Sequence, residues 1–416
     1  MTRNQQLISF CFFSLTLSAV NLHAASAIPF SEPLDHLSIA TGKQLKLDTG
    51  IGSGAFRLAS DPANVIYTIT DRGPNIDLKD AEKIMGADFG DKKGKVFPTP
   101  NFSPSIYSIK IEDGKAIVLD KIQLKTASGI PLSGISNPDT EEAWDINGNA
   151  LPYDIAGIDA EGLVRCNDGS FWVGEEYGPS ILHLTSDGRV IERWVPKGVK
   201  KSLDGADYPI AELLPAILRK RPLNRGIESM AISPDEKFLY FAMQSPLANP
   251  DKEAYTNGRN LRIFKIDAEA GKLVGEYVYV IDTADTFRLD NAKKQQKQND
   301  VKVSEMTAVG TDKLVVLERI SKTTKFYAVD LADAENILNS TWDDSSTSPS
   351  LEQHDATGLK VLNKKLLFNS DDHKGLMAKI EGLAWMGADQ WVMVNDNDFG
   401  ITGESTEFMQ VNMPVE

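Results

Sequence analysis

The chain has 416 residues and a formal net charge of −15, with 59 acidic against 44 basic side chains. Such an excess of negative charge repels phosphate backbones and anionic lipid surfaces, so we expect neither nucleic-acid binding nor membrane insertion, whereas metal cations are favoured partners. The sequence contains two cysteines, Cys11 and Cys166.

The amino terminus has the parts of a signal peptide: basic Arg3, an apolar run over 7–20 and small residues over 24–27. A membrane span needs about 20 apolar residues, and hydroxyl side chains interrupt this run. We therefore predict that residues 1–27 are removed and that the mature domain, residues 28–416, is periplasmic or secreted. Removal leaves one cysteine, which excludes an intramolecular disulfide.

A unit of two short apolar strands joined by a turn recurs along the mature chain. Four of its five copies open on Glu, and each closes on a polar cluster about 15 positions later, a distance that suits a hairpin. The copies cover residues 53–74, 161–179, 228–246, 305–319 and 381–400.

Two further strands follow most copies, for example 181–184 and 189–195 after the second. Four antiparallel strands per repeated unit are typical of a propeller blade. The sequence thus predicts an all-β fold, a β-propeller of five four-stranded blades, with a possible sixth in the insertions. The last copy has room for three strands, so we expect a strand within 28–47 to complete it.

Three segments break the strand pattern and are expected to be long loops near the polar clusters: 77–104, 128–154 and 202–223, the last with a short helix at 209–220. Loops of this length in a compact domain are commonly functional, and a lid over the site is one role for them.

The Glu residues that open the units are the first candidate site. The first strand of each blade lines the channel of a propeller, so these side chains should converge at its mouth. Crowded carboxylates require a cation or protonation, and oxygen-only ligands favour calcium or magnesium. The alternative is that each Glu accepts backbone N–H groups and joins neighbouring blades. The predicted metal ligands are Glu161, Glu228, Glu305, Glu381 and Asp396.

The closing clusters supply the catalytic candidates. Asp71 and Arg72 end the first unit, and Glu175 with Glu176 ends the second. A carboxylate suits acid–base catalysis and an adjacent Arg can hold an anionic group. Turn formation is the alternative for the Asp-rich clusters, but Glu is no turn former. We therefore predict Glu175, Asp71 and Arg72 as catalytic residues.

Signatures of other hydrolases are missing from the sequence. It has no Gly-x-Ser-x-Gly elbow, no His-Glu-x-x-His motif and no phosphate-binding Gly-x-x-x-x-Gly-Lys-Ser loop. A serine or histidine nucleophile is therefore not supported.

Several strings resemble the bacterial phytase-like family, also described as esterase-like activity of phytase: Thr-Asp-Arg-Gly-Pro-Asn at 70–75, Gly-Ile-Asp-Ala-Glu-Gly-Leu at 157–163, the segments starting at Phe171 and Arg225, and Ile-Glu-Gly-Leu-Ala at 380–384. The resemblance covers roughly 50–399. It implies ester or phosphoester hydrolysis by acidic residues, at positions Asp71, Glu161, Glu175, Glu228, Glu305 and Glu381. Ser53 stands where the other units have Glu, which departs from a symmetric ring.

Three functions remain open at this point. The first is metal-assisted hydrolysis of a phosphoester or ester at the channel mouth. The others are a calcium-stabilised binding module without turnover and a sugar-lactone hydrolase, because one fold can carry many functions. In each case we expect a monomer that takes a small anionic or sugar-like substrate.

Overall fold

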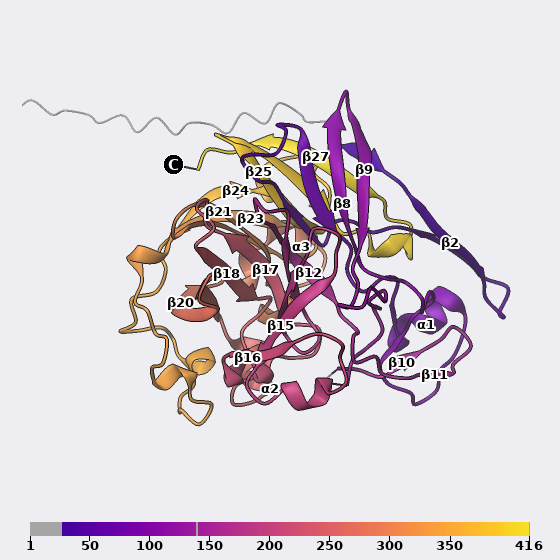
Figure 1. The fold of residues 1–416 in the computed structure, drawn as a ribbon, viewed down its shortest axis with the longest axis horizontal. Helices are drawn as coiled ribbons and strands as arrows, with labels where there is room; N and C mark the ends of the chain where they lie inside the picture. Colours follow the sequence, from indigo (N-terminus) through magenta and orange to yellow (C-terminus); the bar gives the residue numbers. More distant parts are fainter. Residues whose placement is uncertain (1–26, 139, 416) are drawn as a thin grey trace, which may run out of the picture.

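The computed structural model describes residues 27–138 and 140–415, and its regular structure is mostly β. The predicted signal peptide, except for Ala27, lies outside the described residues. Five large sheets make up most of the chain, and two smaller sheets are attached to them (Figure 1). No helix within the described ranges is both long and apolar enough to cross a membrane.

The large sheets follow one another along the chain. Sheet one contains β4 (Gly54–Phe56), β5 (Val65–Ile69), β8 (Ser105–Glu112) and β9 (Lys115–Gln123). Sheet two contains β12 (Ala160–Arg165), β13 (Phe171–Glu175), β14 (Ser180–Leu184), β15 (Val190–Pro196) and β16 (Ile210–Leu214). Sheet three contains β17 (Ile227–Ile232), β18 (Phe238–Met243), β19 (Asn260–Asp267) and β20 (Lys272–Val280).

Sheet four contains β21 (Lys302–Gly310), β22 (Lys313–Arg319), β23 (Thr324–Asp330) and β24 (Lys364–Asn369). Sheet five contains β25 (Ile380–Gly387), β26 (Gln390–Asn395), β27 (Thr406–Asn412) and β1 (Ile28–Phe30). Strand β1 pairs antiparallel with β27, Ile28 opposite Phe408. This pairing confirms the expectation that an amino-terminal strand completes the last sheet.

The first strands of the five sheets contact one another in the order β4, β12, β17, β21, β25 and again β4. The apolar core lies between the faces of neighbouring sheets. Between sheets two and three, for example, Trp172 and Val164 pack with Met230 and Phe241. Strands form here because β-branched and aromatic residues suit a half-buried pleated surface. The polar residues near the starts of the first strands then lie close to one another.

Two smaller sheets lie at one side of the molecule (Figure 1). A small sheet is made of β6 (Ile76–Asp77), β7 (Lys95–Val96), β10 (Ala143–Trp144) and β11 (Ala150–Leu151). Helix α1 (Leu78–Met85) packs beside it, at the lower right of Figure 1. The hairpin of β2 (Pro33–Ser38) and β3 (Gln44–Asp48) extends along the same side.

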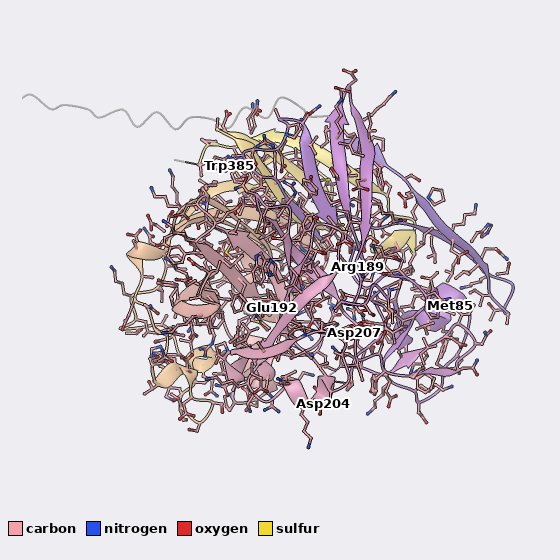
Figure 2. All side chains as sticks on the ribbon, in the orientation of Figure 1. Met85, Arg189, Glu192, Asp204, Asp207 and Trp385 are labelled. Atoms are coloured by element: carbon pink, nitrogen blue, oxygen red, sulfur yellow. The ribbon has the colours of Figure 1, made fainter. Side chains whose placement is uncertain are left out.

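The prediction of a helix at 209–220 is wrong for the first half of this segment. Residues 210–214 form β16, which pairs parallel with β15, Arg193 opposite Ile210, and only 216–220 are helical. Asp207, labelled in Figure 2, lies in the adjoining loop. Its carboxylate accepts the Ser128 N–H at 3.1 Å and holds the loop in place. The other helical elements are α2 (Lys252–Asn257), α3 (Arg288–Asn291), and short 3-10 turns at Lys200–Leu203, Ala216–Lys220, Ala284–Thr286, Gln298–Asp300, Leu331–Asp333, Thr341–Asp343, Leu351–Gln353, Ser370–Asp372 and Asp398–Gly400.

Candidate functional site

A β-bulge interrupts the first strand of sheets two to five at the same place. The pairing shifts register after Ala160, Ile227, Val303 and Ile380. A bulge bends the strand and turns the extra side chain in a new direction. The residues that follow these four positions are therefore equivalent: Glu161, Glu228, Ser304 and Glu381.

Glu305 is displaced by one residue from this set. Its buried carboxylate accepts the N–H of Ala55 in β4 at 3.0 Å and that of Met306 at 2.9 Å. Burial raises the pKa of Glu305, and these backbone donors lower it. Because a shift of one residue turns a strand side chain to the other face, Glu305 joins two first strands instead of meeting the other acids. Its prediction as a metal ligand is not supported by this position.

Five carboxylates from sheets one to three gather in two overlapping groups. Asp71, Asp159 and Glu161 bring one oxygen each to within 4.8 Å of one another, and so do Glu161, Glu176 and Glu228. Glu161 belongs to both groups. Four of the five are at most 8% exposed, and Asp71 is partly exposed. The structure thus brings together predicted Glu161, Glu228 and Asp71.

Burial and like charge act in the same direction on this cluster. The pKa of Glu161 is well above its usual range because of burial and the neighbouring Glu228 carboxylate. Burial raises the pKa of Asp159 to about 7, against the lowering effect of Arg72. The pKa of Glu228 is raised to about 8 by burial and by Glu176. Such shifts show that ionised carboxylates are disfavoured here unless a cation is present.

The donor set fits a divalent cation. Oxygen Oε2 of Glu228 is buried and has no hydrogen-bond partner among the described residues. Carboxylate oxygens are the ligands of calcium and magnesium, whereas zinc sites are rich in His and Cys. A divalent cation would supply the missing partner of this oxygen and would also bind the two carboxylates beside it.

Arg72 enters the cluster from the loop after β5. Its Nη2 atom lies 2.8 Å from Oδ2 of Asp159, and its Nη1 atom lies 2.9 Å from Oε1 of Glu141. Its guanidinium also donates to Asn224 and lies 5.2 Å from the ring centroid of Tyr177. Arg72 is therefore paired with two carboxylates, and the role that this geometry supports is to orient Asp159.

Glu381 and Asp396 lie beside the cluster rather than in it. Glu381 forms an ion pair with Arg319, whose Nη2 atom is 3.9 Å from Oε1 of Glu228. Asp396 accepts the Asp398 N–H at 2.9 Å. Burial and the Asp398 carboxylate raise the pKa of Asp396 to about 8. Neither residue shares the two groups of three that could hold an ion.

Glu175 points away from its neighbour Glu176. Its carboxylate is fully buried and accepts hydrogen bonds from Arg193 at 2.8 Å, Ser180 at 2.5 Å and the Tyr177 N–H at 2.7 Å. Glu176, the residue after the end of β13, belongs to the acidic cluster instead. The geometry supports a structural role for Glu175.

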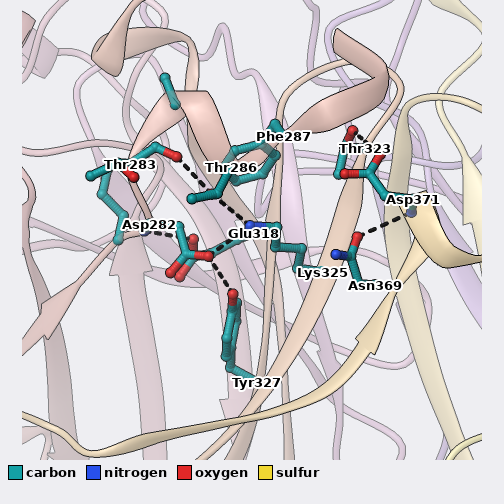
Figure 3. A network of polar contacts seen from close by, with 12 residues as sticks. Asp282, Thr283, Thr286, Phe287, Glu318, Thr323, Lys325, Tyr327, Asn369 and Asp371 are labelled. Carbon is teal, nitrogen blue, oxygen red and sulfur yellow. Dashed lines mark hydrogen bonds and ion pairs between the residues drawn. The ribbon is translucent and has the colours of Figure 1, made fainter. Parts of the chain in front are cut away.

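Glu318 shows the same behaviour in sheet four. It accepts hydrogen bonds from Tyr279 at 2.6 Å and Lys364 at 2.5 Å. Figure 3 shows it within a polar network that also contains Asp282, Lys325 and Tyr327. This network joins sheets three and four and uses none of the cluster carboxylates.

A cationic group borders the acidic cluster on the side of sheet four. The pKa of Lys302 is lowered to about 7 by burial and by the positive charges of Arg319 and Arg225. Arg225 donates to the Asn224 carbonyl at 2.7 Å and to the Tyr255 hydroxyl at 3.3 Å. Cations that repel one another next to carboxylates can hold an anionic substrate group.

The sequence-based selection missed Asp159 and Lys302, although a signal existed. Asp159 lies two residues before Glu161, and Lys302 lies two residues before Ser304. Charged residues this close to the start of a first strand lie near the bulge residue in space, and this proximity in sequence is the signal that could have found them.

A sequence profile described as "Esterase-like activity of phytase" matches residues 53–399. The chain belongs to this phytase-like family. The match confirms the family resemblance of the motifs, and all carboxylates of the cluster lie within it.

A protein of Arthroderma benhamiae named "Uncharacterized secreted protein" is 32% identical over 140 residues. These are 30% of this chain and 27% of that protein, so the match spans about a quarter of the relative. The name of this relative describes a secreted protein.

Solved structures with overall similarity include a PQQ-bound aldose sugar dehydrogenase from Streptomyces coelicolor, with 8% identity, a TM-score of 0.37, and coverage of 95% of this chain and 98% of that chain. A gluconolactonase from Xanthomonas campestris has 10% identity, a TM-score of 0.35, and coverage of 94% and 99%. The calcium-binding protein regucalcin from Agrobacterium tumefaciens has 11% identity, a TM-score of 0.35, and coverage of 89% and 96%. These TM-scores carry no inference about the site.

Proposed function

We propose that the protein is an exported hydrolase that cleaves a phosphoester or ester of a small anionic substrate, assisted by calcium or magnesium. The observation that carries this proposal is that buried acidic side chains and a group of basic side chains lie next to each other. Buried Glu161, Glu176 and Glu228 form one side of the site, and the cationic group of Arg225, Lys302 and Arg319 forms the other.

The acidic side is suited to a divalent cation and the basic side to the substrate. When bound, the cation would polarise the scissile group or lower the pKa of a water molecule. Lys302 and Arg225 are partly exposed, so they can meet an anionic group that arrives from solvent. We assign proton transfer to Asp71, the partly exposed carboxylate of the cluster, and the positioning of Asp159 to Arg72.

The same proposal includes a closed five-bladed propeller. Contacts between the first strands run in sequence through all five sheets and return from β25 to β4. Glu305 supports closure, because it spans from β21 to the backbone of β4. A closed ring would hold the bulge residues at fixed mutual distances, as a catalytic site requires.

The test uses the mature protein, residues 28–416, and a panel of phosphomonoesters, phosphodiesters, carboxyl esters and sugar lactones, each with calcium, magnesium or EDTA. We expect cation-dependent hydrolysis of an anionic ester, and its loss in Glu228→Gln. Glu112→Gln is the matched control, because Glu112 is exposed at the end of β8 and pairs with Lys110. Turnover of a neutral lactone alone, or binding without any turnover, would contradict the proposal.

Export and oligomeric state are part of the same proposal and have direct tests. Cell fractionation should place the mature chain outside the cytoplasm, with Ile28 as its first residue by amino-terminal sequencing. Light scattering should give the mass of a monomer. A cytoplasmic full-length chain or a stable dimer would contradict these expectations.

A further inference from the structure

The carboxylates of the acidic cluster form two groups that share one residue, and this arrangement bears on the number of ions that the site binds. The carboxylates gather as two groups of three rather than as one group of five, and Glu161 alone is common to both. We propose that the site holds two divalent cations bridged by the Glu161 carboxylate. This inference rests on the proposed cation dependence but goes beyond it in number and in ligand assignment.

The spacing within each group suits one ion. Calcium binds oxygen at about 2.3–2.6 Å, so two ligand oxygens of the same ion lie at most about 5 Å apart. The oxygens of each group lie within 4.8 Å of one another. Asp71 and Asp159 would hold one ion, and Glu176 and Glu228 would hold the other. A carboxylate has two oxygens, so Glu161 can serve both.

The bridging residue has free ligand capacity. The side chain of Glu161 is 8% exposed, and neither a hydrogen bond nor an ion pair to a donor is found for its carboxylate among residues 27–138 and 140–415. Oxygen Oε2 of Glu228 is also buried without a partner. A buried carboxylate without a donor is costly unless a cation compensates it, so these two side chains point to bound ions independently of the acidic character of the cluster.

The two ions should differ in affinity. Both oxygens of Asp159 already interact with Arg72, one with its backbone N–H at 3.2 Å and one with its guanidinium at 2.8 Å. An ion beside Asp71 and Asp159 must share these oxygens with a positive charge. For the ion beside Glu176 and Glu228, the part of the chain that the structure describes shows no ion pair of comparable length, since Arg319 lies 3.9 Å from Glu228. We therefore expect the second of these positions to fill first.

Counting bound cations tests the inference without any enzyme assay. Isothermal titration of calcium into the EDTA-treated mature protein, with native mass spectrometry as an independent count, should give two ions per chain with distinct affinities. Asp71→Asn should leave the tighter ion, Glu228→Gln should leave the weaker one, and Glu161→Gln should weaken both by at least tenfold. Glu112→Gln should still bind two.

The outcomes separate this inference from the proposed function. A single ion in the unmodified protein, or loss of the same ion in Asp71→Asn and Glu228→Gln, overturns the two-ion site even if hydrolysis is found. Two ions without hydrolysis uphold it and contradict the proposed function. Circular dichroism and thermal melts of each variant exclude misfolding, and Glu176→Gln replaces Glu228→Gln if the latter fails to fold.

Discussion

Cation binding at the cluster should become tighter as the pH rises. Burial and Glu176 raise the pKa of Glu228 to about 8, and burial raises the pKa of Asp159 to about 7. A cation binds the ionised forms, so below these values each binding event must displace protons. For Glu228 alone, the apparent Kd should fall about fiftyfold between pH 6 and pH 8, and ionisation of Asp159 should add to this change.

The same pKa shifts give the sign of the stability effect. A carboxylate with a raised pKa in the folded state favours folding only while it is protonated. The cation-free protein should therefore lose stability as the pH rises from about 4.5 towards 8, by about 1 kcal/mol per pH unit for each such group. A bound cation reverses the preference, so the increase in Tm caused by calcium should grow with pH.

Titration calorimetry measures this directly. Calcium binding at pH 6, followed in buffers of different ionisation enthalpy at constant ionic strength, gives the number of protons released per ion. We expect at least one. In Glu228→Gln the total number of protons released per chain should fall, because Gln has no proton to release at this pH and the ion beside Glu176 no longer binds. No proton release, or a Kd that changes less than threefold between pH 6 and pH 8, would refute the reasoning, and Glu112→Gln should behave like the unmodified protein.

Three further substitutions separate structural from functional acids and bases. Glu305→Ala should lower the free energy of unfolding by about 2–4 kcal/mol in urea titrations, because it leaves buried N–H groups unpaired. The number of bound cations should stay the same, and a lost cation would show that Glu305 is a ligand. Glu175→Gln breaks a buried ion pair with Arg193 and should lower the free energy of unfolding by about 3–5 kcal/mol. The number of bound cations should again be unchanged. An unfolding free energy equal to that of the unmodified protein would contradict the structural role of Glu175. Lys302→Met should raise KM for an anionic substrate about tenfold without altering cation binding, and an unchanged KM would remove Lys302 from the substrate site.

Most of the fold could be predicted from the sequence because the repeated unit is local. The hairpin turn and the two apolar strands of each copy lie within about 20 residues, and the strand missing from the last copy pointed to the amino terminus. Strand β16 was missed because its partner, β15, is a parallel neighbour across a loop. Its short, mostly apolar run, Ile-Ala-Glu-Leu-Leu, does not distinguish a strand from a short helix.

The site was harder to predict because the spacing of side chains depends on the bulges. Glu305 precedes Met306, and Glu228 precedes Ser229 and Met230, so the two strings look alike when Glu is aligned with Glu. The strand pairing instead aligns Glu228 with Ser304. No rule of local composition indicates which strand residue will be the extra one, and a shift of one residue decides which side the carboxylate faces.

The serine at this position explains why the site has two sides of opposite charge. Oγ of Ser304 accepts a hydrogen bond from Nε of Arg319 at 2.9 Å and donates one to Oε1 of Glu228 at 3.2 Å. A glutamate there would add a further carboxylate to the cluster and would reach into the space of the Arg319 guanidinium. With serine, Arg319 reaches from sheet four to Glu381 of sheet five and stays beside Lys302. Together with Ser53 of the first unit, this departure replaces a ring of equivalent acids by an acidic side, formed by sheets one to three, and a basic side next to sheet four. We assign the cations to the acidic side and the anionic substrate group to the basic side.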